Sequence, residues 1–176
     1  MNMVIASITA IILFTTNIHY TFAEQSASNA SLADLKNYHV DTPEMVSSGL
    51  PNRVHFEKLK AIGVSNIIDL IPGDRSEEIA LMDKLNLNYH NIQVEWGNPT
   101  IKNFREYIFT MKQFSKSEGI TLTHCRLNWR GAVFTYLYRV TQLKESEEMA
   151  KQDMLTIWTP NDTWQAFINK VLAQYN

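Results

Sequence analysis

Cys125 and Arg130 are the residues of this chain whose types and spacing most favour chemistry on an anion. Four residues separate them, and they follow a short strand-like segment, Ile120–Thr123. A thiolate is a strong nucleophile, and a guanidinium can hold two phosphate oxygens at once. If the loop between them joins a strand end to a helix start, backbone N–H groups and the helix dipole attract the same anion. The pair therefore predicts attack of a thiolate on a bound phosphate monoester, with a covalent thiophosphate intermediate.

Cys125 and the two residues beside it in the sequence each allow two interpretations. Cys125 is the only cysteine, so an intramolecular disulfide is excluded, and the alternative to a nucleophile is a buried structural thiol. His124 either orders the loop and favours the thiolate or is a hydrogen-bonded core histidine, and these two roles are compatible. Arg126 either lines the mouth of the site and attracts anions or points to solvent.

The segments that must position this loop alternate between strand-like and helix-like patterns. Such alternation predicts an α/β fold of three layers, with a mostly parallel central sheet of about four to five strands and helices on both faces. Binding sites in such sheets lie at the carboxyl ends of the strands, which is where the segment before Cys125 ends. The expected strands cover residues 45–48, 66–71, 88–94 and 120–123. The expected helices follow the caps Asn52, Ser76 and Thr100 and cover residues 130–143, 146–156 and 160–174.

His124-Cys125 followed by Arg130 resembles the phosphate-binding loop of the protein tyrosine and dual-specificity phosphatases, whose signature is His-Cys, five residues and Arg. With four intervening residues, this loop is similar to a bacterial short-loop branch, to which the phosphatase-like domain of β-lactamase-hydrolase-like proteins is related. That loop typically reads His-Cys-Ala-Ser-Gly-Asn-Arg. Ser48–Pro51 and Ile67–Ile71 stand where the branch has Ser-Gly-Gln-Pro and Val-Ile-Asn-Leu-Arg.

The resemblance spans residues 38–143 and implies a tyrosine-phosphatase-like fold without a cofactor. It implies that Cys125 is the nucleophile and that Arg130 is the phosphate ligand. The other residues of the loop are the expected substrate-binding residues: His124, Arg126, Leu127, Asn128, Trp129 and Gly131.

Three departures from the family loop bear on turnover. Leu127, Asn128 and Trp129 replace small residues, although asparagine tolerates the left-handed conformation that glycine would supply. Gly131 stands where the larger family often has a hydroxyl that helps to release the thiolate. These departures keep a catalytically weak phosphate- or sulfate-binding module as an alternative. A rhodanese-like sulfurtransferase, which also uses one cysteine in an anion-binding loop, is the other alternative to a phosphatase.

A general acid is expected upstream of the loop. In tyrosine phosphatases it is an aspartate on a mobile loop, and Glu95 in the segment Val94–Pro99 stands in the matching stretch. A carboxylic acid there could protonate the leaving oxygen and later activate water. The alternative is an ordinary solvated side chain. Asp69 and Asp74 are weaker candidates, and Asp69, inside an apolar segment, is expected to hydrogen-bond locally.

Composition narrows the possible partners. The net charge is −2 and no Lys/Arg-rich run occurs, so a nucleic-acid partner is not expected. The histidines lack metal-ligand spacing and the glycines form no nucleotide-binding loop, so neither a metal nor a cofactor is expected. The expected partner is a phosphorylated small molecule or protein, and the sequence leaves the oligomeric state open.

The N-terminal 23 residues predict export. They contain no Lys, Arg, Asp or Glu, residues 4–14 are mostly apolar, and Thr21-Phe22-Ala23 resembles a small-x-small cleavage site. We therefore expect a signal peptide over residues 1–23 and a periplasmic mature protein that no longer contacts the membrane. An uncleaved N-terminal anchor is the alternative. Residues 24–37 are expected to be flexible, and residues 38–176 are expected to form a single domain.

Overall fold

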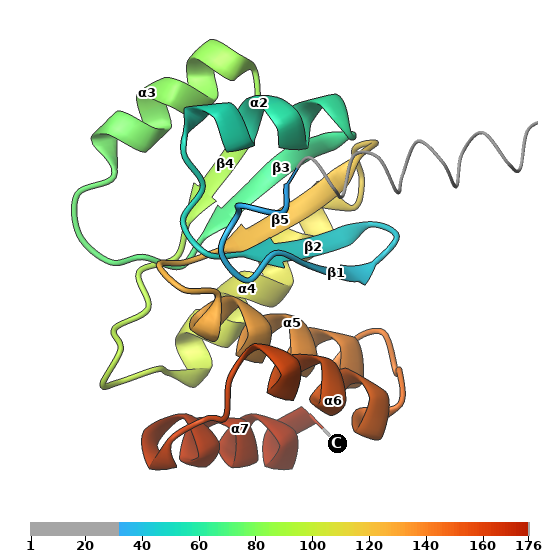
Figure 1. Cartoon of the computed structure of the whole chain (residues 1–176). Coiled ribbons are helices and arrows are strands. Elements are labelled where there is room, and N and C mark those ends of the chain that lie inside the picture. Colours follow the sequence, from blue (N-terminus) through green and yellow to red (C-terminus); the bar gives the residue numbers. More distant parts are fainter. Residues whose placement is uncertain (1–31, 176) are drawn as a thin grey trace, which may run out of the picture.

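A five-stranded sheet forms the centre of the molecule in the computed structural model, which describes residues 32–175 (Figure 1). The strand order is β1-β2-β5-β3-β4, and all neighbouring pairs are parallel except β1 and β2. This confirms the expected mostly parallel sheet. The strands are β1 (His39–Thr42), β2 (Met45–Ser48), β3 (Val64–Asp69), β4 (Asn88–Asn91) and β5 (Ile120–His124).

Helices cover both faces of the sheet, which confirms the three-layer prediction (Figure 1). One face carries α2 (Arg53–Ala61) and α3 (Ser76–Leu85). The other face carries α4 (Ile101–Phe114) and α5 (Trp129–Thr141), with α6 (Glu147–Ile157) and α7 (Asp162–Tyr175) packed beyond α5. Each face has its own apolar core, one centred on Phe56 and Leu59 of α2 and the other on Phe104 of α4 and Phe134 of α5.

Two of the predicted helix caps are present and one is wrong. Asn52 and Thr100 each form a capping box with the residue three positions later. Ser76, by contrast, is the first residue of α3, and its backbone N–H donates to Asp74 at 2.9 Å. Similarly, the last helix begins at Asp162, because the Asn161 side chain accepts from Trp164 N–H and so fixes the first turn later than expected.

The third predicted strand is shorter than expected. Its pairing with β3 ends at Asn91, opposite Asp69, where β3 itself ends. The Asn91 side chain then donates to the carbonyl oxygens of Asp69 and Ile71, and Ile92 N–H donates to Asp69 O. Residues 92–94 therefore leave the sheet at its carboxyl edge, which directs the following segment toward the loop after β5.

The segment before β1 is only partly covered by the described residues. Leu32 and Leu35 are buried in the core of the α2 face, so the expectation of flexibility over residues 24–37 is wrong for residues 32–37. The predicted signal peptide, residues 1–23, lies outside the described residues. Within the described part of the chain, no helix combines the length and hydropathy needed to cross a membrane.

Candidate active site

The loop after β5 lies where three parallel strands end together. Ser48 of β2 and Asp69 of β3 both pair with His124, the last residue of β5. Cys125 N–H donates to Ser48 O at 3.2 Å, so the ladder continues to the nucleophile itself. The loop then enters α5 at Trp129. The thiol thus lies between the end of β5 and the N-terminal end of α5, where unpaired N–H groups and the helix dipole favour an anion.

Asn128 shapes the turn between the thiol and the helix. Its φ is 64° and ψ is 5°, the left-handed conformation expected for it. The side chain is fully buried, and its amide nitrogen donates to Asn37 O at 2.8 Å and to Ser47 Oγ at 3.0 Å. A Cβ on Gly131 would overlap the side-chain oxygen of Asn128. The position of the Asn128 side chain therefore leaves room only for glycine at position 131.

The residues before β1 and after β2 hold the outer side of the loop. Asn37 donates a side-chain hydrogen bond to Leu127 O at 2.8 Å, and Leu50 N–H donates to Arg126 O at 3.3 Å. Gly49 lies so close that an added Cβ would be 2.9 Å from Lys36 O and 3.1 Å from Arg126 O. The Ser-Gly-x-Pro segment therefore supports the loop through a close backbone approach. The contribution of Asn37 was missed, because nothing in the local pattern of that segment indicates it.

Cys125 and Arg130 face one pocket of about 310 Å³. Trp96, Arg126, Leu127 and Trp129 complete its lining. Cys125 is 1% exposed and Arg130 is 8% exposed, so both side chains are buried at the base of this pocket's lining. The structure thus brings together the two residues that the sequence pairs, and it places Arg126 in the lining as well.

Arg130 is fixed by the segment that follows β4. Its Nε–H donates to Val94 O at 2.9 Å, and its guanidinium carbon lies 5.4 Å from the centre of the Trp96 ring. A cation over an aromatic face is favourable. Because Nε is already bonded, the two terminal nitrogens remain for an anion in the pocket.

All four tryptophans of the chain gather beside the pocket. Trp129 stacks on Trp158 with ring centres 5.3 Å apart, and Trp96 lies 5.7 Å from Trp129. Trp164 donates from Nε1 to Trp96 O at 3.1 Å. Trp129 therefore forms a wall that is backed by Trp158, which itself does not line the pocket. Trp129 is one of the expected substrate-binding residues, whereas the sequence did not predict that Trp96, in ring contact with it, would also line the pocket.

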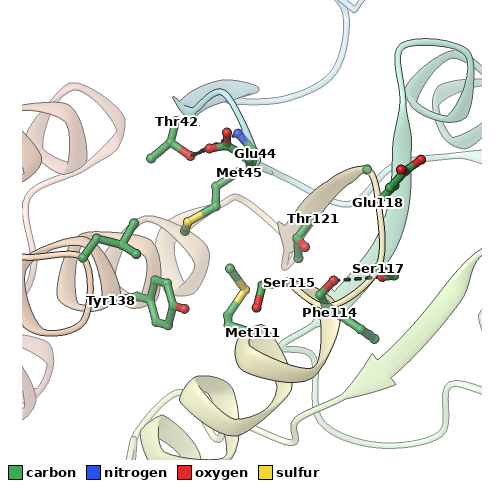
Figure 2. A pocket seen from close by; sticks show the side chains of 12 residues that line it. Thr42, Glu44, Met45, Met111, Phe114, Ser115, Ser117, Glu118, Thr121 and Tyr138 are labelled. Carbon is green, nitrogen blue, oxygen red and sulfur yellow. Dashed lines mark hydrogen bonds between the residues drawn. The ribbon is translucent and has the colours of Figure 1, made fainter.

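A second pocket, of about 390 Å³, lies at the other end of the sheet, between the start of β2 and the ends of α4 and α5 (Figure 2). It is larger, but its lining contains no cysteine, histidine, lysine or arginine. Met45, Met111 and Tyr138 form part of its surface, with Glu44 and Glu118 at its edge. This lining offers neither a thiol nor a cationic side chain for an anion, so the candidate active site is the smaller pocket.

A buried charged cluster lies behind the loop, and it was not anticipated beyond His124. His124 Nε2 lies 2.9 Å from Glu78 Oε1, and its Nδ1 lies 3.9 Å from Asp69 Oδ1. Arg75 Nε donates to Asp69 Oδ2 at 2.5 Å, and its terminal nitrogen pairs with Glu78 Oε2. Asp69 also accepts from Ile71 N–H at 2.8 Å, which confirms the expected local hydrogen bond.

Three members of this cluster are also potential metal ligands. One atom each of Asp69, Glu78 and His124 lie within 4.8 Å of one another, and no other such group is found among residues 32–175. The guanidinium of Arg75, however, already contacts both carboxylates and would repel a dication. The arrangement therefore fits an ion-pair network better than a cation site.

The candidate acids lie outside the pocket lining. Glu95 is exposed, and it is the adjacent Trp96 that faces the pocket. Asp74 is also exposed, and hydrogen bonds from Ser76 hold the pKa of its carboxyl below the usual range, which makes it a poorer proton donor. Asp69 is occupied by the network behind the loop. The role of Glu95 as general acid stays a prediction.

Several solved structures resemble this chain over most of its length. A DUF442 protein from Shewanella putrefaciens is 30% identical, with a TM-score of 0.74 over 84% of this chain and 98% of that protein. The core catalytic domain of the PP-IP phosphatase Siw14 from S. cerevisiae, solved with citrate, is 18% identical, with a TM-score of 0.65 over 77% of this chain and 85% of that domain. TpbA from P. aeruginosa, solved with pTyr, is 19% identical, with a TM-score of 0.59 over 80% of this chain and 91% of that one. No family model and no curated protein sequence matches the chain.

Proposed function

Because this chain belongs to the DUF442 family of cysteine-dependent, tyrosine-phosphatase-like phosphatases, we propose that it hydrolyses phosphate monoesters through a cysteinyl-phosphate intermediate. The single observation that carries the proposal is the shared pocket of Cys125 and Arg130 at the start of α5. A nucleophile, a bidentate cation and a helix N-terminus directed at one anion can together support phosphoryl transfer to the thiolate.

The proposed reaction has two steps. The Cys125 thiolate attacks phosphorus while the ester oxygen leaves with a proton, and water then breaks the S–P bond and releases inorganic phosphate. Arg130 presents its two terminal nitrogens to the equatorial oxygens while Val94 O holds Nε. We assign proton donation to Glu95, an exposed residue next to the pocket residue Trp96; this role requires the Glu95 side chain to turn toward the pocket.

The walls of the pocket favour a flat, apolar leaving group. Trp96, Trp129 and Leu127 provide aromatic and aliphatic surface around the phosphate position, and Arg126 is the only cation in the lining besides Arg130. A substrate with several phosphates would need more positive charge than this. We therefore propose an aryl phosphate or a phosphotyrosine-like ester as the substrate class.

Hydrolysis of an aryl phosphate by the purified protein tests the proposal. Cys125→Ser and Arg130→Ala should each abolish turnover, whereas Arg53→Ala, which removes an exposed arginine paired with Glu57 on α2, should not. Trp129→Ala should lower kcat/KM for aryl phosphates more than for glycerol phosphate. Equal rates of Cys125→Ser and the unmodified protein would contradict the mechanism.

The general acid is tested with leaving groups of different quality. Glu95→Gln should slow hydrolysis of an alkyl phosphate, whose oxygen needs a proton, and should leave a good phenolic leaving group nearly unaffected. Asp74→Asn, a change at the other exposed candidate, is the matched control. An unchanged rate on the alkyl phosphate would exclude Glu95 as the acid.

The near-complete burial of Cys125 supports one alternative, a weak phosphate-binding module. Binding of phosphate without hydrolysis over a broad pH range would favour it. Transfer of sulfur from thiosulfate to cyanide would instead indicate a sulfurtransferase.

We also propose that the protein is exported to the periplasm with cleavage after Ala23. The support is the uncharged, apolar start of the sequence. Mass spectrometry of the exported protein should give an N-terminus at Glu24, and retention of residues 1–23 would contradict this.

A further inference from the structure

The charged cluster behind the loop has an unusual balance of charge. Two carboxylates, Asp69 and Glu78, are opposed by one guanidinium, that of Arg75. Arg75 binds the outer oxygen of each carboxylate, and this leaves the inner oxygens turned toward His124. Because Asp69 is fully buried and Glu78 is nearly so, an unbalanced negative charge here would be strongly unfavourable.

The His124 ring is placed to supply the missing positive charge. Its side chain is 0% exposed, and each ring nitrogen faces a carboxylate oxygen, at 2.9 Å for Nε2 and 3.9 Å for Nδ1. Within residues 32–175, neither ring nitrogen has a hydrogen-bond partner, nor does the facing Glu78 Oε1, so the contacts of the ring with the two carboxylates are ion-pair contacts. An imidazole carrying a proton on both nitrogens places a positive charge beside both carboxylates, whereas a neutral ring must leave one nitrogen lone pair facing an anion.

The other groups in contact with His124 and Asp69 among residues 32–175 carry no charge. The charged Arg53 and Glu77 line the same surface pocket as Arg75 and Glu78, but they are exposed, and Arg53 pairs with Glu57. On the α2 side, Phe56 presents an edge-on ring with its centre 5.9 Å from the imidazole. On the β4 side, the Tyr89 hydroxyl donates to Asp69 Oδ2 at 2.8 Å, and burial raises the pKa of this phenol, so it stays neutral. On the β2 side, Ser48 donates its hydroxyl to Gly49 O.

The nucleophile is the residue that follows His124. We propose that Glu78, on α3, is a positioning residue for the cysteine loop: it holds a doubly protonated His124 behind Cys125, and the resulting positive charge stabilises the thiolate. Asp69 and Arg75 serve by fixing Glu78 and the second ring nitrogen. The rate consequence rests on the proposed phosphatase function, but the effect on the thiol itself does not.

Alkylation of the thiol measures this directly, because Cys125 is the only cysteine in the chain. The rate of reaction with iodoacetamide follows the thiolate fraction, so its pH profile has a midpoint. We expect Glu78→Gln to move this midpoint upward by about one pH unit, seen as a roughly tenfold slower alkylation below it. Glu77→Gln, at the exposed neighbouring position on α3, is the matched control and should leave the midpoint in place.

Two further measurements separate positioning from simple structural damage. In a His124→Asn background, Glu78→Gln should have no further effect on the midpoint, because its effect runs through the imidazole. If Glu78→Gln fails to fold, Glu78→Asp keeps the charge but shortens the arm and should give an intermediate midpoint. A midpoint equal to that of the Glu77→Gln control, or an equal shift in the His124→Asn background, would overturn the proposal.

The same variants distinguish this inference from the proposed function. The acidic limb of the kcat/KM profile for an aryl phosphate should move with the alkylation midpoint. If the unmodified protein hydrolyses no phosphate but the midpoint still shifts, the proposed function fails and the role of Glu78 stands. If hydrolysis is normal and Glu78→Gln shifts neither profile, the role of Glu78 fails and the proposed function stands.

Discussion

Gly131→Ala should destabilise the protein, although the same change inside a helix normally stabilises it by about 1 kcal/mol. The added Cβ would overlap the side-chain oxygen of Asn128. Asn128 must then move away from Asn37 O and Ser47 Oγ. Two lost hydrogen bonds at about 1 kcal/mol each, and partners left buried without a donor at about 1–3 kcal/mol, outweigh the helix gain. We expect a net loss of about 2–4 kcal/mol.

Urea denaturation and thermal unfolding measure this loss. For a chain of this size, each kcal/mol corresponds to roughly 2–4 °C in Tm. A double-mutant cycle with Asn128→Gly isolates the cause, because glycine keeps the left-handed turn and frees the space. In that background, Gly131→Ala should be neutral or stabilising by up to about 1 kcal/mol. Equal destabilisation in both backgrounds, or a Gly131→Ala protein as stable as the original, would refute the steric argument.

Other changes test the loop and the sheet. Arg130→Lys keeps the charge but loses the planar fork and the bond to Val94 O, so kcat/KM should fall on the order of 100-fold without loss of folding, as measured by steady-state kinetics. Gly49→Ala should also slow turnover and weaken phosphate binding, since its Cβ would push the loop backbone outward. The Asp41 carboxylate, 3.4 Å away, raises the pKa of His39 above 6.5. The pair of His39 and Asp41 therefore stabilises the folded protein fully below about pH 6.5, and this stabilisation is lost as the pH rises through the raised pKa of His39. Unfolding measured at a series of pH values should show this loss of stability in the original protein and not in His39→Gln.

Much of the architecture could be predicted because its signals are local. Apolar segments of strand length alternate with helical stripes, and Asn52 and Thr100 cap helices through residues only three positions away. The errors occur where distant residues decide. Strand β4 ends early because β3 ends at Asp69, and the buried Leu32 shows that a polar, small-residue segment can still contribute core side chains.

The candidate site also contains residues that could be predicted from the sequence and residues that could not. Cys125 and Arg130 belong to one short segment, so spacing alone brings them to one loop, and the left-handed turn at Asn128 follows from residue type. Glu78 and Trp96 could not be inferred, because their contacts with His124 and Trp129 join elements that are far apart in sequence. Only the sheet order, which places β5 between β2 and β3, brings those elements together.

The clustering of tryptophans has a spectroscopic consequence. The chain has four tryptophans, and Trp96, Trp129, Trp158 and Trp164 lie in mutual ring contact beside the pocket. Intrinsic fluorescence excited at the indole band therefore originates from one place in the folded molecule. An oxyanion that enters the pocket changes the environment of Trp96 and Trp129, and it can be titrated by quenching or a shift in emission. The protein thus carries its own optical reporter of site occupancy, without a label or a chromogenic substrate.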